Sequence, residues 1–143
     1  MPIGEDIPLL IPISIVLVVF VIFLVSLFSN QIEQTEIIEM SQEASVAGNF
    51  ILNSFSDIEG NLDTSKLNGY CEYLCSIGDC CRLKYLNYYS NYETKITIEA
   101  NGDCWCWDNN AYFSEQKVTS TFPIQVKDGN NQFLGQVIVN VGK

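Results

Sequence analysis

The chain has 143 residues, six Cys, no His and a formal net charge of −10, from seven Lys and Arg against seventeen Asp and Glu. This length allows one folded domain with a non-globular segment and excludes a multidomain enzyme. Residues 1–65 hold nine carboxylates and no Lys or Arg, which argues against nucleic acid as a partner because phosphate binding needs clustered basic side chains. The absence of His removes its general-base and metal-ligand chemistry.

A short hydrophilic segment, residues 1–6, precedes an apolar run from Ile7 to Phe28, in which 18 of 22 residues are Leu, Ile, Val or Phe. As a helix at about 1.5 Å per residue the run measures roughly 33 Å, enough to cross a hydrocarbon core of about 30 Å. A cleaved signal peptide is the alternative, but it requires a basic start, a shorter apolar core and a small-residue cleavage site. Because these features are missing, we expect the helix to be retained as a membrane anchor or as the core of an assembly.

The pattern after Phe28 predicts that the helix continues into an amphipathic part, residues 29–58, since no Pro occurs there. Its apolar residues recur at spacings of three and four: Ile37, Met40, Ala44, Ala47, Ile51, Phe55 and Ile58. Three carboxylates lie together beside this stripe: Glu36, Glu39 and Glu43.

The stripe contains small residues, and Ala44, Ala47 and Gly48 are the candidate helix-packing residues because they allow another backbone to approach closely. Two interpretations are open. The stripe packs only on the head domain of the same chain, or it also contacts neighbouring copies of the protein.

The pattern changes to loop and strand near Glu59-Gly60-Asn61 and predicts a head domain over residues 59–143. The run Lys95–Glu99 alternates between apolar and polar, Asn101-Gly102 follows, and Cys104–Trp107 alternates again. Asn-Gly between two alternating runs is the strongest short signal for a β-hairpin.

A second hairpin is predicted within Val118–Val141, with its turn at Asp128–Asn131, and Arg82–Tyr89 is a candidate further strand. Pro123 lies in the second hairpin and is expected at an edge or an irregularity of the sheet, because proline cannot donate a ladder hydrogen bond. The fold class is therefore α+β: a long amino-terminal helix followed by a small antiparallel sheet of about four or five strands.

The cysteines of the head, all within 36 residues, are Cys71, Cys75, Cys80, Cys81, Cys104 and Cys106. Their spacings, C-x₃-C, C-C and C-x-C, match neither a zinc ribbon nor an iron–sulfur motif, so three disulfides are favoured over a metal site. Disulfides persist on the oxidising side of a membrane, which predicts a cytoplasmic amino terminus and a head outside the cell.

The pairing of the cysteines can be narrowed from the 15 possibilities. A bridge between Cys104 and Cys106 or between adjacent Cys80 and Cys81 would be strained, and excluding both leaves ten pairings. In all ten, Cys104 and Cys106 each bond to the loop 71–81, so the disulfides fasten this loop to the first hairpin.

No catalytic, metal or cofactor site is predicted. Acidic pairs such as Asp103 with Asp108 have simpler roles in turns, and the run at Asp128 lacks the register and the distal Glu of a calcium loop. The chain is therefore not expected to be an enzyme. The head is rich in Tyr and Trp, and Trp105 and Trp107 lie on the face of their strand opposite Cys104 and Cys106, as core residues or as an interaction surface.

The layout resembles type IV pilins, and most of all the pilin-like surface proteins of archaea. The residues that carry the resemblance are Gly4-Glu5 at the end of a short hydrophilic start, the apolar helix Ile7–Phe28 that continues as an amphipathic helix, and the disulfide-bonded head. The resemblance implies cleavage after Gly4, with Glu5 at the new amino terminus, and helices that leave the bilayer to form the core of a filament. Glu5 and Asp6 would then pair with the terminal amine of an adjacent subunit.

The expected function is a structural subunit of an extracellular type IV-like filament for adhesion or surface attachment, with copies of itself and, before assembly, the membrane as partners. The alternative is a monomeric, single-pass, membrane-anchored extracellular binding or adhesion domain.

Overall fold

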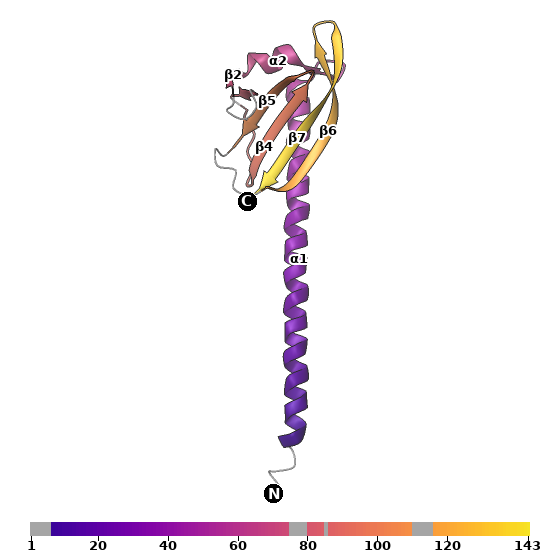
Figure 1. Ribbon diagram of the computed structural model, residues 1–143, viewed down its shortest axis with the longest axis vertical. Coiled ribbons are helices and arrows are strands. Elements are labelled where there is room, and N and C mark those ends of the chain that lie inside the picture. Colours follow the sequence, from indigo (N-terminus) through magenta and orange to yellow (C-terminus); the bar gives the residue numbers. More distant parts are fainter. Residues whose placement is uncertain (1–6, 75–79, 85, 110–115) are drawn as a thin grey trace. The chain divides into compact units, whose positions relative to one another are not determined.

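A computed structural model describes residues 7–74, 80–84, 86–109 and 116–143 (Figure 1). The chain divides into two compact units, Met1–Glu36 and Ile37–Lys143. Helix α1, Ile7–Phe55, contributes to both units. The long helix predicted from the sequence is confirmed, but it ends at Phe55, three residues before the predicted boundary.

In the second unit, α1 buries the central part of the predicted apolar stripe. Met40, Ala44, Ala47, Ile51 and Phe55 are at most 1% exposed and belong to one core cluster with residues of the sheet. The two ends of the stripe differ, because Ile37 is 47% exposed and Ile58 is fully exposed. The period of the stripe therefore identified the buried side of the helix but overestimated its length.

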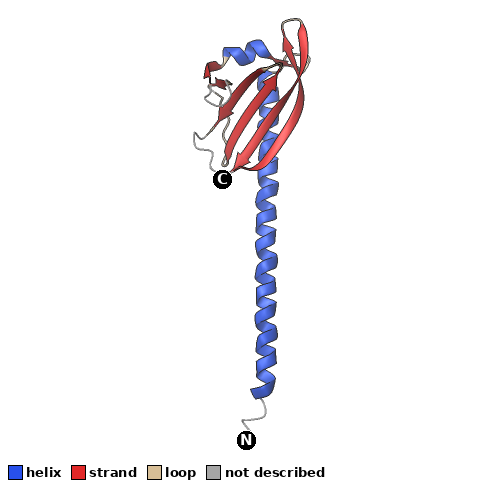
Figure 2. Ribbon diagram, in the orientation of Figure 1, coloured by secondary structure: helices blue, strands red, loops and turns tan. Residues whose placement is uncertain are grey.

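The second unit contains a seven-stranded sheet in the order β1-β6-β7-β4-β5-β3-β2 (Figure 2). The strands and the short helix between the first two are β1 (Leu62–Asp63), α2 (Thr64–Gly69), β2 (Cys71–Leu74), β3 (Cys81–Leu83), β4 (Glu93–Ala100), β5 (Asp103–Asp108), β6 (Gln116–Asp128) and β7 (Asn131–Gly142). The predicted α+β class is confirmed.

The four long strands β4 to β7 pair antiparallel, as predicted. The prediction of about four or five antiparallel strands is corrected in two respects: the short strands β1, β2 and β3 bring the described sheet to seven strands, and β1 with β6 and β3 with β5 pair parallel. The candidate strand at Arg82–Tyr89 is confirmed only where it overlaps β3, whose last residue is Leu83.

Both predicted hairpins are present with tight turns. In the first, Ala100 pairs with Asp103, and Asn101 and Gly102 between them have φ values of +52° and +89°, as a type I′ turn requires. In the second, Asp128 pairs with Asn131, and Gly129 takes a φ of +59°. Asn and Gly are the residues that adopt these left-handed conformations at low cost, which is why the turns occur at these positions.

Alternation along the strands places one face of the sheet, here called the inner face, against α1. Its buried side chains include Ile96 and Ile98 of β4, Trp105 and Trp107 of β5, and Val137, Val139 and Val141 of β7. The opposite, outer face carries polar residues such as Glu99 and Gln136, which are hydrogen-bonded across strands at 2.9 Å. The head thus has one helix-covered core and one outer sheet surface.

Candidate functional site

The first unit presents a continuous apolar surface along α1. Fourteen large apolar side chains between Ile11 and Phe28 are 45–68% exposed: Ile11, Ile13, Ile15, Val16, Leu17, Val18, Val19, Phe20, Val21, Ile22, Phe23, Val25, Leu27 and Phe28. Burying one such side chain fully is worth about 1.5–3 kcal/mol, so a helix of this composition is not stable when surrounded by water. It requires lipid or other apolar helices around it.

By its length and composition, α1 qualifies as a candidate membrane span, and none of its most apolar stretch is buried within the chain. Pro12 lies inside the helix, within one and a half turns of its start at Ile7. The predicted processing residues Gly4 and Glu5, and the neighbouring Asp6, lie outside the described residues. The exposed apolar surface of α1 is therefore described from Ile11 onward.

The candidate packing residues Ala44, Ala47 and Gly48 are buried in the core of the head. Gly48 lies against Phe122 of β6, and a Cβ atom at position 48 would be 2.6 Å from Phe122 Cε2. The interpretation that this stripe contacts neighbouring copies is corrected by this geometry, because the sheet of the same chain already covers these residues. Small side chains here serve the close approach of α1 to its own sheet.

Two of the three carboxylates beside the stripe accept hydrogen bonds from tyrosines of the head. Tyr92 Oη donates to Glu39 Oε2 at 2.8 Å, and the hydroxyl of Tyr88 donates to Glu43. Burial, together with the neighbouring Glu43 carboxylate, raises the pKa of Tyr88 well above its usual value. The acidic edge of α1 is therefore tied to the segment that leads into β4.

The side of α1 that is turned away from the sheet is mostly neutral within the second unit, with Glu39 at its margin, since this exposed residue lies seven residues before Val46. Ile38 and Val46 are each 57% exposed on this side, and the residues between them on the same side, Gln42 and Ser45, are exposed and neutral. Positions separated by four and eight residues share one face of a helix. Ile38, Gln42, Ser45 and Val46 are here called the neutral face of α1.

The cysteines form disulfides, and two bridges are described. Cys71 bonds Cys81, with Cα atoms 5.6 Å apart, and Cys80 bonds Cys104, with Cα atoms 4.6 Å apart. Cys106 is disulfide-bonded as well, whereas Cys75 lies outside the described residues. The bridge between Cys80 and Cys104 joins the loop 71–81 to the first hairpin, in agreement with the set of pairings derived from the sequence.

The adjacent residues Cys80 and Cys81 serve different faces of the sheet. Cys81 pairs in register with Trp105 and belongs to the core cluster on the inner face. Cys104 precedes Trp105 in β5 and therefore points to the outer face, where its bridge to Cys80 lies. The two bridges thus fasten β3 on both faces.

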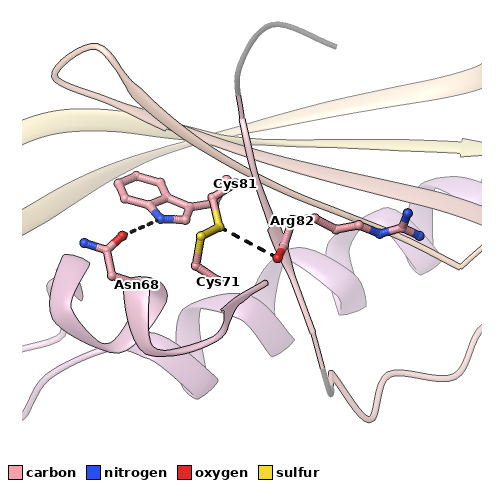
Figure 3. The surroundings of a disulfide bond; sticks show 5 residues. Asn68, Cys71, Cys81 and Arg82 are labelled. Carbon is pink, nitrogen blue, oxygen red and sulfur yellow. Dashed lines mark hydrogen bonds between the residues drawn. A yellow bond between two sulfur atoms is a disulfide. The ribbon is translucent and has the colours of Figure 1, made fainter. Parts of the chain in front are cut away.

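The surroundings of the inner bridge are shown in Figure 3. Trp105 Nε1 donates to Asn68 Oδ1 at 2.9 Å, which ties the end of α2 to β5. Cys81 Sγ lies 3.7 Å from the carbonyl oxygen of Arg82, and since this sulfur is bonded to Cys71 and carries no hydrogen, this is a contact and not a hydrogen bond. These contacts hold α2, β2, β3 and β5 together, so the surroundings of this bridge have a structural role.

The turn that follows α1 is held by charged groups. Asp57 Oδ1 accepts hydrogen bonds at 2.9 Å from the backbone N–H groups of Glu59 and Asn61, and Lys127 Nζ lies 3.6 Å from both Asp57 Oδ2 and Glu59 Oε2. Lys66 Nζ donates to the carbonyl oxygen of Ser56 at 2.6 Å, at the carboxyl end of the helix. Cations at this end also offset the helix dipole.

Two of the acidic residues considered as catalytic or calcium-binding candidates, Asp108 and Asp128, have structural partners. Asp108 forms an ion pair with Arg82 at 3.2 Å, and Asp128 Oδ1 accepts a hydrogen bond from Thr64 Oγ1 at 2.9 Å. Asp103 is exposed at the start of β5. Within the described ranges, no group of three or more His, Cys, Asp or Glu side chains is arranged to hold a metal ion.

The aromatic residues of the head divide between core and surface. Trp105 and Trp107 are 3% and 8% exposed, and Tyr88 packs edge-to-face on Trp107 with ring centroids 5.8 Å apart. The core interpretation of the two Trp residues is therefore confirmed. Tyr70 and Tyr89 are exposed at 45% and 86%.

Several structural residues were not recognised from the sequence. Asp63 caps α2 by accepting from Ser65 N at 2.9 Å, and its sequence signal, Asp followed by Thr-Ser, was present. Asn109 Oδ1 accepts from Thr94 N at 2.8 Å, while Asn109 Nδ2 donates to Tyr92 O at 2.7 Å, and no local pattern indicates this contact.

No protein-family model, curated protein or solved structure matches the chain.

Proposed function

We propose that the protein is a structural subunit of an extracellular filament of the type IV pilus kind, in which copies associate through the apolar part of α1. The observation that carries the proposal is the exposed apolar surface from Ile11 to Phe28 on a helix that also forms part of the core of a disulfide-bonded head. In a filament, the helices of neighbouring subunits supply the apolar surroundings that water does not.

The neutral face around Ile38 and Val46 also supports assembly. Ile38 and Val46 are each 57% exposed in the head, and packing against a neighbouring helix would remove this apolar surface from water. Glu39 and Glu43, the two acidic residues of this part of α1, are hydrogen-bonded to Tyr92 and Tyr88 of the same chain, and Glu39 remains exposed at the margin of that face.

The disulfides support a position of the head outside the cell, because such bonds persist in oxidising compartments. In this proposal the apolar helix lies in the membrane before assembly, and the role of the assembled filament is adhesion or surface attachment. The head contributes its outer sheet face and the exposed Tyr89 to the outside of the filament.

A monomeric, membrane-anchored surface domain is the second candidate, and one observation favours it. Ala44, Ala47 and Gly48, the residues best suited to close helix packing, are covered by the sheet of the same chain and are not available to another copy. In this second candidate α1 spans the membrane, and the head functions alone.

Electron microscopy and mass spectrometry of filaments sheared from source cells distinguish the two candidates. A matched pair of variants sharpens the test: Val46→Lys places a charge on the neutral face of α1, and Leu134→Lys places one on β7, where Leu134 is 83% exposed. We expect Val46→Lys to abolish or strongly reduce filaments while the protein remains in the membrane, and Leu134→Lys to leave them unchanged. A protein found only as a membrane-bound monomer in wild-type cells would establish the second candidate.

A further inference from the structure

Strand β6 has a partner on both sides only near its end. On one side, β7 pairs with it from Gln116 to Asp128, whereas on the other side β1 pairs only at Val126 and Lys127. Among the strands that the structure describes, none lies beside the segment from Thr121 to Gln125 on the side away from β7. The side chains of Thr121, Pro123 and Gln125 are exposed, and because no described strand pairs with this segment on that side, it forms a sheet edge.

The hairpin turn determines which backbone groups of β6 point to this edge. Asp128 and Asn131 flank a two-residue loop, so they form a hydrogen-bonded pair, and hydrogen-bonded pairs then alternate along the ladder. The register is continuous from Asp128 back to Val118. Gln125, Pro123 and Thr121 then belong to the non-hydrogen-bonded pairs of this ladder. Their backbone groups therefore point away from β7.

Pro123 therefore occupies a position where it breaks no hydrogen bond to β7, which explains how a proline is accommodated in the longest strand of the sheet. The missing N–H instead belongs to the open edge. Thr121 and Gln125 flank it with outward N–H and C=O groups of the kind that pair with another strand.

The edge segment is suited to pair with the same segment of a second copy. Val118 to Gln125 contains no charged residue, so two such strands brought together antiparallel do not repel each other. In the register that centres on position 123, the two central hydrogen bonds would be donated by residue 123 of each copy. Proline cannot donate either of them.

We infer that Pro123 keeps the open edge of β6 from pairing with the β6 edge of another copy of the chain. The inference concerns the head alone and is independent of whether the protein polymerises through α1. It matters wherever heads are concentrated, on a membrane or along an assembly, because an uncharged open edge favours sheet-to-sheet association.

The full chain in detergent micelles tests the inference. Pro123→Thr restores the N–H with a residue suited to strands, Pro123→Ala is a second variant that adds no β-branched side chain, and Thr121→Val is the matched control. The control adds apolar surface at the same edge but no donor. Light scattering after size-exclusion chromatography gives the association state over a range of concentrations, and near-ultraviolet circular dichroism checks the fold.

We expect the apparent association constant of Pro123→Thr to exceed that of wild type by about tenfold or more, as two added hydrogen bonds of ordinary net strength would give. Pro123→Ala should change in the same direction, and Thr121→Val should behave as wild type. Amide hydrogen exchange in the peptide around 121–125 should be fast in wild type. In Pro123→Thr it should become slower as the protein concentration rises.

Three results would overturn the inference. In the first, both folded proline variants associate no more than wild type. In the second, Thr121→Val associates as strongly as Pro123→Thr, so that apolar surface and not the donor is responsible. In the third, the wild-type amides at positions 121 and 125 are already protected at low concentration, so that the edge is covered within one chain.

Discussion

Gly48 of α1 and Phe122 of β6 are in such close contact that a Cβ atom at position 48 would lie 2.6 Å from Cε2 and 2.9 Å from Cζ of the ring. The contact sets how closely the helix approaches strand β6. It also means that a bulky or charged residue at position 48 disturbs the head before it affects any contact with another copy.

Replacement of Gly48 by Ala is expected to lower the stability of the head by about 1 kcal/mol. Overpacking costs about 1–3 kcal/mol, and the better helix propensity of Ala returns up to about 1 kcal/mol of this. Thermal or denaturant unfolding of the single variant measures the effect. The double variant Gly48→Ala/Phe122→Leu should recover part of the loss, whereas additive losses would show that the ring does not cause it.

Removal of residues 1–36 is expected to leave a folded, water-soluble head, since Ile37–Lys143 forms a compact unit that contains the core cluster and both described disulfides. Size-exclusion chromatography and circular dichroism of residues 37–143 check this. A fragment that is unfolded, or that aggregates with intact disulfides, would show that the apolar part of α1 is needed for the stability of the head.

The head is expected to lose stability in acid through two aspartates. The pKa of Asp57 is lowered from 3.8 because, although burial opposes ionisation, the N–H groups of Asn61 and Glu59 and the Lys127 ammonium outweigh it. Hydrogen bonds from Ser65, first from its side chain, lower the pKa of Asp63. Below its ordinary pKa a carboxyl in the unfolded chain binds a proton that the folded chain resists, so the stabilisation is complete above about pH 5 and lost as the pH falls through the folded-state values.

The measurement for this prediction is the melting temperature of the head at pH 7, 4 and 3. The variant Asp57→Asn/Asp63→Asn keeps the capping oxygens but does not titrate, so its melting temperature should fall less between pH 7 and pH 3 than that of wild type. Equal falls in the two proteins would assign the acid sensitivity to other carboxylates.

The disulfides are expected to differ in their contribution to stability. The bridge from Cys80 to Cys104 spans 24 residues and the bridge from Cys71 to Cys81 spans 10. Loop-closure entropy then makes the longer bridge worth more by about 0.8 kcal/mol, within totals of about 2–4 kcal/mol each. Denaturant unfolding of Cys80→Ser/Cys104→Ser and Cys71→Ser/Cys81→Ser compares them, and the reverse order would contradict the entropic account.

The third bridge is expected by elimination to join Cys75 and Cys106, the two cysteines that remain after the described pairs. Proteolysis without reduction, followed by mass spectrometry of linked peptides, identifies it. A free thiol at Cys75 in the intact protein would refute it.

Local signals in the sequence were sufficient for the hairpins and insufficient for the short strands. Asn101-Gly102 and Gly129 determine tight turns by themselves, so β4 to β7 follow from residues close in sequence. In contrast, the two residues of β1 are strand only because β6 lies beside them, and β3 depends on β5. Such pairings form between segments far apart in the chain and leave no periodic pattern.

The packing residues of α1 are a second case in which the local sequence was not sufficient to predict the structure. The spacing of Met40, Ala44 and Ala47 correctly identified a buried side of α1, but periodicity does not say what covers that side. The covering group, Phe122 with its neighbours on the sheet, comes from a strand more than 70 residues later in the sequence, whose position depends on the whole sheet.

Because Cys80 and Cys81 point to opposite faces of the sheet, the partners with which they form disulfides depend on how β3 was aligned with β5 when the bonds formed. If β3 slipped by one residue against β5, each cysteine would point to the face that the other occupies, and Cys80 would face Cys71 while Cys81 faced Cys104. Oxidation in that alignment would fix the exchanged pair of bonds. A disulfide map of the oxidised protein therefore reports whether the sheet was correctly aligned when its thiols were oxidised, even after the chain has been denatured for mass spectrometry.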